Sequence, residues 1–284
     1  SAAHPNLPIL PILKEANQLR ISLFSDLLSE LGLSISNPAP LQLTPLFLLG
    51  SSTQRSGQIK GERNLFQIRH TLDSDVVEDA PNSYPLVIAN RLPQDHVWDL
   101  PLYYSSLKSD HIGRCLLYAK VIESTQTILV QNPSLASWLP NGTVVLAEEQ
   151  LAGKGRGKNR WTSSVGSLQF SLVLRHADPS NLAIIQYLVA LAIAEVIEEG
   201  YPDGASPVKI KWPNDIVEVG GKLKLGGILI NSQTDGDRFL LIIGVGLNVE
   251  RSPNSDLCTI NEVLRKANAP VWSKEELLAS FCSR

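Results

Sequence analysis

The stretch Ala147–Phe170, AEEQLAGKGRGKNRWTSSVGSLQF, places a basic, glycine-rich loop between two strand-like runs. The run Val144–Glu148 enters the loop, and in Leu168–Arg175 every second residue is large and apolar, which is typical of a half-buried strand. Glycine tolerates positive φ and lets backbone amides approach a ligand closely, so a loop held at both ends can wrap around an anion. The same composition also fits a solvated loop or an RGG-like contact to nucleic acid.

Periodicity predicts further elements on both sides of this loop. We expect a strand at residues 115–121, a helix-like run from Ser124 to Trp138, and a helix at 181–199 that packs against the sheet. Later strands are expected at residues 208–212, 225–231 and 239–245. Asp235-Gly236 is a hairpin-turn signal between the last two. This order predicts an α+β fold, in which helices flank a mixed β-sheet.

Composition limits the classes of function. The chain has 284 residues and a net charge of −3, with 43% hydrophobic and 19% charged residues, an ordinary globular balance. A dedicated DNA-binding domain is normally basic throughout, so no nucleic-acid partner is expected. Three cysteines without CxxC spacing indicate a reducing compartment and no structural zinc. No membrane span or signal peptide is recognised, so we expect a cytoplasmic protein without membrane contact.

Several side chains outside the loop have both a structural and a functional interpretation. Ser124 or Thr125 can cap the following helix, or it can bind a ligand. Trp161 fits a core position as well as a stacking wall, and Trp212 is expected in the core. Lys211 lies on the polar face of its strand, because it alternates with apolar neighbours.

Three motifs together resemble the biotin protein ligase family. They are Gly153-Lys154-Gly155-Arg156-Gly157 followed by Trp161, then Lys211-Trp212-Pro213-Asn214-Asp215, then Gly226-Gly227-Ile228-Leu229. They fall in the family's order, and the resemblance covers roughly residues 114–265. It is to the eukaryotic type, also called holocarboxylase synthetase, fungal-like or plant-like. The resemblance implies a catalytic fold like that of the class II aminoacyl-tRNA synthetases.

The resemblance also implies an ATP-dependent reaction in two steps. The carboxylate of biotin attacks the α-phosphate of ATP, which gives biotinyl-5′-AMP and pyrophosphate. A lysine amine on a biotin carboxyl carrier domain, such as that of acetyl-CoA carboxylase or pyruvate carboxylase, then attacks this acyl-adenylate, and AMP leaves. Mg²⁺ is expected on the ATP phosphates; the sequence has no direct metal-ligand spacing, and Asp215 is a candidate contact.

The site residues are carried over by their match to the family's motifs. Arg156 and Lys211 are the implied catalytic residues, since fixed cations stabilise the charge that develops on the phosphate. The implied biotin contacts are Ser124, Thr125, Gln126, Gln150, Gly153, Lys154, Gly155, Arg156, Lys211 and Gly227. The implied contacts to ATP or the adenylate are Arg156, Trp161, Asn214 and Asn248.

The sequence predicts three parts along the chain. Residues 1–109 form an N-terminal extension with a helix at Lys14–Leu31, and residues 110–265 form the catalytic domain. Residues 266–284 form a helix that leads to a C-terminal β domain, absent from this chain. A lipoate-protein ligase, a nucleic-acid-binding module that uses the basic loop, and a catalytically inactive scaffold are the alternatives.

Overall fold

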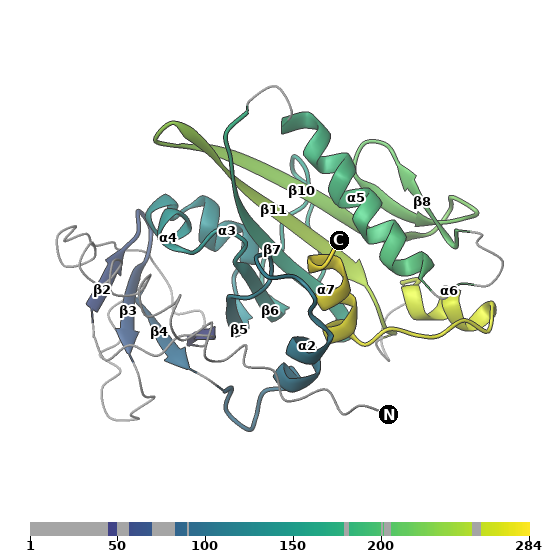
Figure 1. Cartoon of the computed structure of the whole chain (residues 1–284), viewed down its shortest axis with the longest axis horizontal. Coiled ribbons are helices and arrows are strands. Elements are labelled where there is room, and N and C mark those ends of the chain that lie inside the picture. Colours follow the sequence, from purple (N-terminus) through teal and green to yellow (C-terminus); the bar gives the residue numbers. More distant parts are fainter. Residues whose placement is uncertain are drawn as a thin grey trace.

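The structure is a computed structural model, shown in Figure 1, and it describes eight segments of the chain. They are residues 45–49, 57–69, 83–89, 91–178, 182–199, 201, 206–251 and 257–284. The helix predicted at Lys14–Leu31 lies outside the described residues. Among the described residues, no helix is both long and apolar enough to cross a membrane.

One mixed sheet of 11 strands organises the described residues, in the order β2-β3-β4-β1-β5-β6-β7-β11-β10-β9-β8. The strands are β1 (Leu46–Leu49), β2 (Gly57–Lys60), β3 (Leu65–Arg69), β4 (Ser83–Ala89), β5 (Leu116–Ile122), β6 (Val144–Gln150), β7 (Ser167–His176), β8 (Val208–Lys211), β9 (Asp215–Glu218), β10 (Lys224–Asp235) and β11 (Arg238–Asn248). The pairs β3–β4, β4–β1 and β5–β6 are parallel, and the other neighbours are antiparallel. This arrangement confirms the predicted α+β class.

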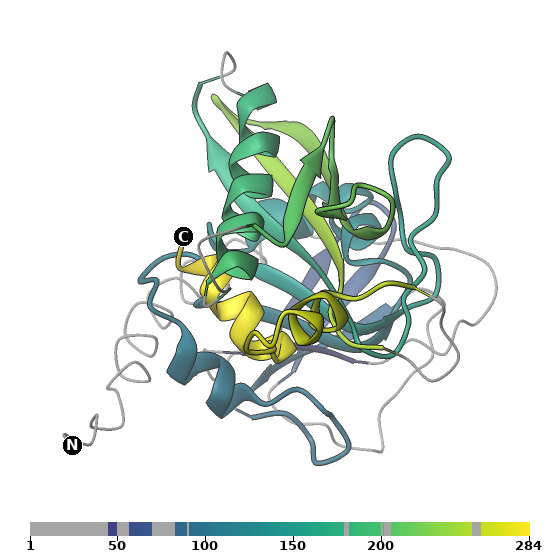
Figure 2. The ribbon, with the colours of Figure 1, turned by 90° about the vertical axis from the view of Figure 1, so that its right-hand side faces the viewer.

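Helices cover both faces of the sheet, as the two views in Figures 1 and 2 show. The helices are α2 (Leu100–Ser106), α3 (Thr125–Val130), α4 (Pro133–Trp138), α5 (Leu182–Glu198), α6 (Ile260–Lys266) and α7 (Lys274–Cys282). One core cluster joins the sheet to α2, α5, α6 and α7, and a second joins it to α3 and α4. Adjacent β5 residues divide between the clusters, because Leu116 faces the first and Leu117 the second. The site is therefore built on a sheet that is packed on both faces.

The sequence located most elements from residue 115 onward, but it missed the break between α3 and α4, strand β9, and the short helices α2 and α6. The run expected from Ser124 to Trp138 divides into α3 and α4, since Pro133 lacks the amide that a continuous helix needs. Strand β9 directly follows the turn after β8 and was not expected. The hairpin turn at Asp235-Gly236 is confirmed, with Gly236 at φ +64°.

Strands β1–β4 belong to the expected N-terminal extension, and they extend the same sheet. Strand β1 pairs in parallel with β4 and antiparallel with β5, so the ladder continues from the extension into the following segment. The division at residue 109 stays a prediction.

The turn between β2 and β3 contacts the junction of α3 and α4. The buried Asn132 Oδ1 accepts hydrogen bonds from the backbone amides of Arg63 (2.9 Å) and Asn64 (2.8 Å), and Nδ2 donates to Asn64 Oδ1 at 3.0 Å. A Cβ at Gly61 would lie 2.5 Å from Asn132 Oδ1, so the close approach requires glycine. Arg63 Nη1 also lies 3.1 Å from a carboxylate oxygen of Glu123. The turn thereby contacts both ends of α3.

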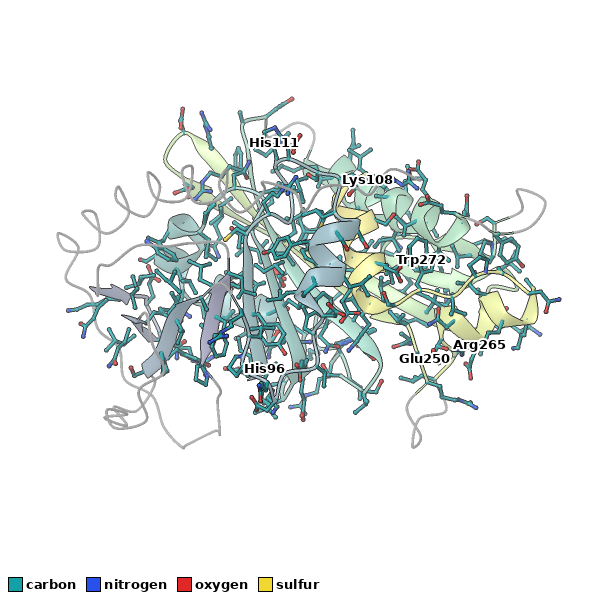
Figure 3. All side chains as sticks on the ribbon, turned by 60° about the horizontal axis from the view of Figure 1, so that its bottom comes forward. His96, Lys108, His111, Glu250, Arg265 and Trp272 are labelled. Atoms are coloured by element: carbon teal, nitrogen blue, oxygen red, sulfur yellow. The ribbon has the colours of Figure 1, made fainter. Side chains whose placement is uncertain are left out.

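Glu250, two residues after β11, forms an ion pair with Arg265 near the end of α6, and Figure 3 labels both residues. Arg265 donates two hydrogen bonds to Glu250, at 2.9 and 2.5 Å. These bonds lower the pKa of the Glu250 carboxyl to about 2. The pair fixes the segment after β11 against the last turn of α6.

Candidate functional site

A cavity of about 220 Å³ lies where the N-terminus of α3 meets β6, β7, β10 and β11, and the loop between β6 and β7 covers it. Most of the residues carried over from the family's motifs line it. They are Ser124, Thr125, Gln126, Gln150, Lys154, Gly155, Arg156, Trp161, Asn214, Asp215 and Gly227. Gly153, Lys211 and Asn248 are not part of the lining.

One end of the cavity is polar and uncharged, and it is organised by the N-terminus of α3. Ser124 caps this helix: its Oγ accepts from the backbone amides of Gln126 (3.2 Å) and Thr127 (3.3 Å). The backbone amide and hydroxyl of Thr125 both lie within hydrogen-bond distance of Gln150 Oε1, at 2.8 and 3.1 Å. The capping interpretation of Ser124 is confirmed, and the cap leaves its hydroxyl proton free to donate into the cavity.

Gln126 connects this end to the sheet. Its Nε2 donates to Ile242 O at 2.9 Å and to Asn231 Oδ1 at 2.8 Å, and its Oε1 lies 2.9 Å from Ser171 Oγ. A Cβ at Gly244 would lie 2.6 Å from Gln126 Oε1, so a glycine is needed beneath it. The side chain is held by internal partners on the three strands β7, β10 and β11, which makes this end of the cavity preorganised.

Two residues of β7, Gln169 and Ser171, line the cavity although they belong to none of the three motifs. The alternation along the strand could have identified them. Leu168, Phe170 and Leu172 belong to the core cluster that joins the sheet to α2, α5, α6 and α7, so the residues between them face the opposite side of the sheet. Ser171 Oγ also lies 3.0 Å from Thr125 Oγ1, so it links two predicted biotin contacts.

The opposite end carries the charges of the cavity. Lys154, Arg156 and Arg160 reach it from the loop, and Lys224 reaches it from β10. The carboxylate in its lining is that of Asp215, which pairs with Lys224 Nζ at 2.8 Å. Arg156 Nη1 donates to Asn214 Oδ1 at 3.2 Å. Cations outnumber the acid here, so this end attracts anions.

The basic loop is a small hairpin. Lys154 and Arg160 form a β-bridge, Gly155 N donates to Asn159 O at 3.0 Å, and Trp161 N donates to Gly153 O at 3.0 Å. Gly157 lies at the tip with φ +63°, a conformation that favours glycine. The loop stands away from the sheet in Figure 2, and the hairpin bonds direct its cations toward the cavity.

Trp161 combines the two roles that the sequence left open. Its ring packs on β11, because a Cβ at Gly246 would lie 2.6 Å from Trp161 Cε2. The ring also lines the cavity and is half-buried. The backbone of Gly153 lies close to the backbone of Trp161, since a Cβ at Gly153 would lie 2.5 Å from Trp161 O.

Lys211 and Asn248 lie outside the lining. Lys211 ends the edge strand β8 and is exposed. Asn248 is buried, and its Nδ2 donates to Lys224 O at 3.3 Å. The expectation that Trp212 is a core residue is wrong, because it is 75% exposed. It directly follows β8, which is an edge strand of the sheet, and its Nε1 donates to the Tyr187 hydroxyl at 2.6 Å.

Acidic and sulfur ligands do not gather anywhere in the described segments. No group of three or more His, Cys, Asp or Glu side chains that could hold a metal ion occurs among these residues. Asp215 is the acidic residue in the cavity lining, so a cation that binds together with a ligand would meet its carboxylate.

Comparisons with known proteins point to one family. Residues 118–248 match the Biotin/lipoate A/B protein ligase family. Human biotin--protein ligase is 30% identical over 277 residues, which cover 90% of this chain and 37% of that protein. Biotin--protein ligase 2 of Arabidopsis thaliana is 35% identical over 196 residues, which cover 66% of this chain and 56% of that protein. The chain thus spans well under two thirds of these relatives.

Among solved structures, the crystal structure of biotin protein ligase from Leishmania major in complex with biotinyl-5-AMP is similar to this chain, with a TM-score of 0.48 and 25% sequence identity. The match covers 58% of this chain and 71% of the Leishmania chain.

Proposed function

Because residues 118–248 match the Biotin/lipoate A/B protein ligase family, we propose that the protein is an ATP-dependent biotin protein ligase. In this proposal it activates biotin as biotinyl-5′-AMP and transfers the biotinyl group to a lysine of a carboxylase's biotin carboxyl carrier domain. The observation that carries the proposal is the polarity of the cavity, with an uncharged hydrogen-bonding end at α3 and a cationic end under the loop. Biotin has the same polarity, a neutral ureido ring and a carboxylate at opposite ends.

The uncharged end suits the ureido ring. A buried urea must pair its carbonyl oxygen and both N–H groups, because an unpaired polar group costs about 1–3 kcal/mol. Ser124 keeps a hydroxyl proton for the carbonyl, and Thr125 Oγ1 keeps a lone pair for an N–H after its bonds to Gln150 and Ser171. Gln126 and Gln150 hold these groups in place. The dithiolane ring of lipoate has no such donors and acceptors, which favours biotin.

The cationic end suits the first chemical step. A carboxylate oxygen of biotin forms a bond to the α-phosphorus, and the bond to pyrophosphate breaks, so negative charge gathers where two anions meet. Arg156 is placed there with its guanidinium beside Asn214, and Lys154 and Gly155 follow the same loop. Fixed cations stabilise this charge better than water does. Trp161 offers a flat wall for the adenine ring, and Gly227 leaves room for the biotin tail.

Transfer requires no nucleophilic side chain. The neutral amine of the acceptor lysine attacks the acyl carbon of the adenylate, the amide bond forms as the bond to AMP breaks, and the amine gives up one proton to water. The departing phosphate keeps its negative charge beside Arg156. Mg²⁺ would neutralise phosphate charge when ATP binds, held mainly by the phosphates and water with Asp215 as the nearby carboxylate. Lys211 and Asn248, which do not line the cavity, remain proposed contacts to biotin and ATP.

The remaining parts of the proposal concern the whole protein. We assign the catalytic domain to residues 110–265, the extension to residues 1–109, and residues 266–284 to a segment after the catalytic domain that contains α7 (Lys274–Cys282). Carboxylases such as acetyl-CoA carboxylase and pyruvate carboxylase are the proposed acceptors, and the cytosol is the proposed compartment.

Exchange of labelled pyrophosphate into ATP tests the first step directly. Wild-type protein should catalyse exchange with biotin, but not with lipoate or without either acid. Arg156→Ala should lower the rate by about a hundredfold, the scale of losing one preorganised charge contact. Lys158→Ala removes a loop cation that does not line the cavity and should have little effect. Exchange that ignores biotin, or that survives Arg156→Ala unchanged, rules out the assignment.

A further inference from the structure

Gln169 carries a hydrogen-bond acceptor that no described residue pairs with. The residue is 1% exposed and lines the cavity from β7. Its Nε2 donates to Ala147 O at 3.0 Å and to Glu148 O at 2.7 Å. Its Oε1 is buried and has no hydrogen-bond partner among the described residues. Because a buried oxygen without a donor is costly and rare, we expect this atom to be paired when the cavity is filled.

The two bonds of Nε2 fix the orientation of this amide. A backbone carbonyl oxygen can only accept, so Ala147 O and Glu148 O both require the NH₂ group of Gln169 on the side of β6. Turning the amide over would lose both bonds and bring oxygen against oxygen. Oε1 is therefore held in place as an acceptor, and a ligand that brings an N–H or O–H group can satisfy it.

The amide of Gln169 lies at the uncharged end of the cavity. Gln169 is two residues from Ser171 on the same face of β7, about 6.5 Å along the strand. Ser171 Oγ in turn lies 3.0 Å from Thr125 Oγ1. The Gln169 amide reaches toward β6, whereas the ring of Trp161 packs on Gly246 of β11, on the other side of β7. The free acceptor therefore belongs with the groups around α3 and not with the wall proposed for adenine.

One of the two N–H groups of a ureido ring still lacks an acceptor at this end. Thr125 Oγ1 keeps one lone pair, which serves one N–H. Gln150 Oε1 is already occupied, because the amide and the hydroxyl of Thr125 both lie within hydrogen-bond distance of it. Among the buried side-chain acceptors that line the cavity in the described part of the chain, Gln169 Oε1 is the one without a partner.

We propose that Gln169 is a specificity-determining residue, whose Oε1 accepts a hydrogen bond from one ureido N–H of biotin while Thr125 Oγ1 accepts from the other. This inference rests on the proposed function. The bonds from Nε2 to the end of β6 hold the acceptor before the ligand arrives. A ring that carries oxygen in place of that N–H sets two acceptors against each other, so the site rejects it.

Calorimetry without ATP tests this role with biotin and its two cyclic carbamate analogues, in which one or the other ureido N–H is replaced by oxygen. Wild-type protein should bind each analogue about tenfold or more weakly than biotin, since each leaves a buried acceptor unpaired. Gln169→Met keeps the length of the side chain and removes its amide. In this variant the preference for biotin over one analogue should fall below about threefold, and the preference over the other should persist. The matched control Gln233→Met removes an amide that also donates to a backbone carbonyl, Val130 O at 3.2 Å, outside the cavity lining, and should keep both preferences.

The preferences are ratios, so a general weakening caused by the lost bonds to β6 cancels out of them. If both preferences survive in Gln169→Met, or if wild-type protein binds an analogue as well as biotin, the role of Gln169 is wrong while the proposed function stands. Weaker binding of ATP alone, with both preferences intact, would assign the acceptor to the adenine amine and would also overturn it. Wild-type protein that binds neither biotin nor the analogues overturns the proposed function itself.

A measurement on the wild-type protein covers the case in which Gln169→Met does not fold. In nuclear magnetic resonance spectra of the complex with isotope-labelled biotin, one ureido proton should show a nuclear Overhauser contact to the side-chain NH₂ of Gln169, which is bonded to the same carbon as Oε1. Absence of this contact, with both ureido protons visible, overturns the role of Gln169.

Discussion

Asn132→Ala tests whether the turn between β2 and β3 stabilises the helix that carries the uncharged end of the cavity. The substitution removes a fully buried amide that accepts from Arg63 N and Asn64 N and donates to Asn64 Oδ1 and Ile128 O. Two backbone donors lose their partner, at about 1–3 kcal/mol each. Because Arg63 is only half-buried, water will replace part of this loss. We expect the free energy of unfolding to fall by about 2–4 kcal/mol.

Urea and thermal unfolding measure this loss, which corresponds to a decrease in Tm of roughly 5–15 °C for a domain of this size. Gln131→Ala is the matched control: its amide also contacts Arg63, but it is exposed, so the change should stay within about 0.5 kcal/mol. A second readout is the KM for biotin in pyrophosphate exchange, which should rise in Asn132→Ala because Ser124 and Thr125 lie on the same helix. An unfolding free energy for Asn132→Ala that matches the Gln131→Ala value would refute the reasoning.

Two further predictions concern β11 and the segment after it. Gly246→Ala places a Cβ 2.6 Å from the ring of Trp161 and should cost about 1–3 kcal/mol of unfolding free energy; in a Trp161→Ala background the cost should vanish, and additive losses would contradict the contact. The Glu250 pKa is lowered to about 2 by Arg265, so the pair stabilises the fold above the carboxyl's ordinary pKa of 4.5 and loses this contribution as pH falls toward 2. Since Glu250 is 41% exposed, Glu250→Gln should cost less than about 1 kcal/mol at pH 6 and nearly nothing at pH 2, and a cost independent of pH in urea unfolding would count against the pair.

The sequence predicted those parts of the fold that depend on local periodicity. Strand β7 was recognisable because large apolar residues alternate along it, and the β10–β11 hairpin because Asp-Gly matches its turn. The order of the strands was not readable, since β1 pairs with β5 across about 70 residues of chain that carry no local signal for the pairing. The role of the 61–64 turn was hidden for the same reason, because Asn64 and Asn132 meet only in the folded chain.

The site was predicted where motif residues lie on one element, and less well where elements meet. The loop cations and the start of α3 were identified together, and the structure brings them to one cavity. Lys224 was overlooked because its position depends on a bulge and on Asn248, neither of which has a sequence pattern. Trp212 was misjudged because an apolar residue beside a strand gives no information on whether the strand lies at an edge.

The two ends of the cavity differ in how they are held, and this difference has a consequence for the proposed reaction. At the uncharged end, Gln126 and Ser171 are buried and paired across α3, β7 and the hairpin β10–β11, so a ring bound there meets groups that are already ordered. At the cationic end, Arg156 and Lys224 are exposed and make single contacts, to Asn214 and Asp215. Discrimination among acids should therefore reside at the α3 end, where an unpaired buried group is costly, whereas the cations should govern the rate of adenylation. Ser124→Ala should accordingly raise the KM for biotin more than it lowers kcat, and Arg156→Ala should do the reverse.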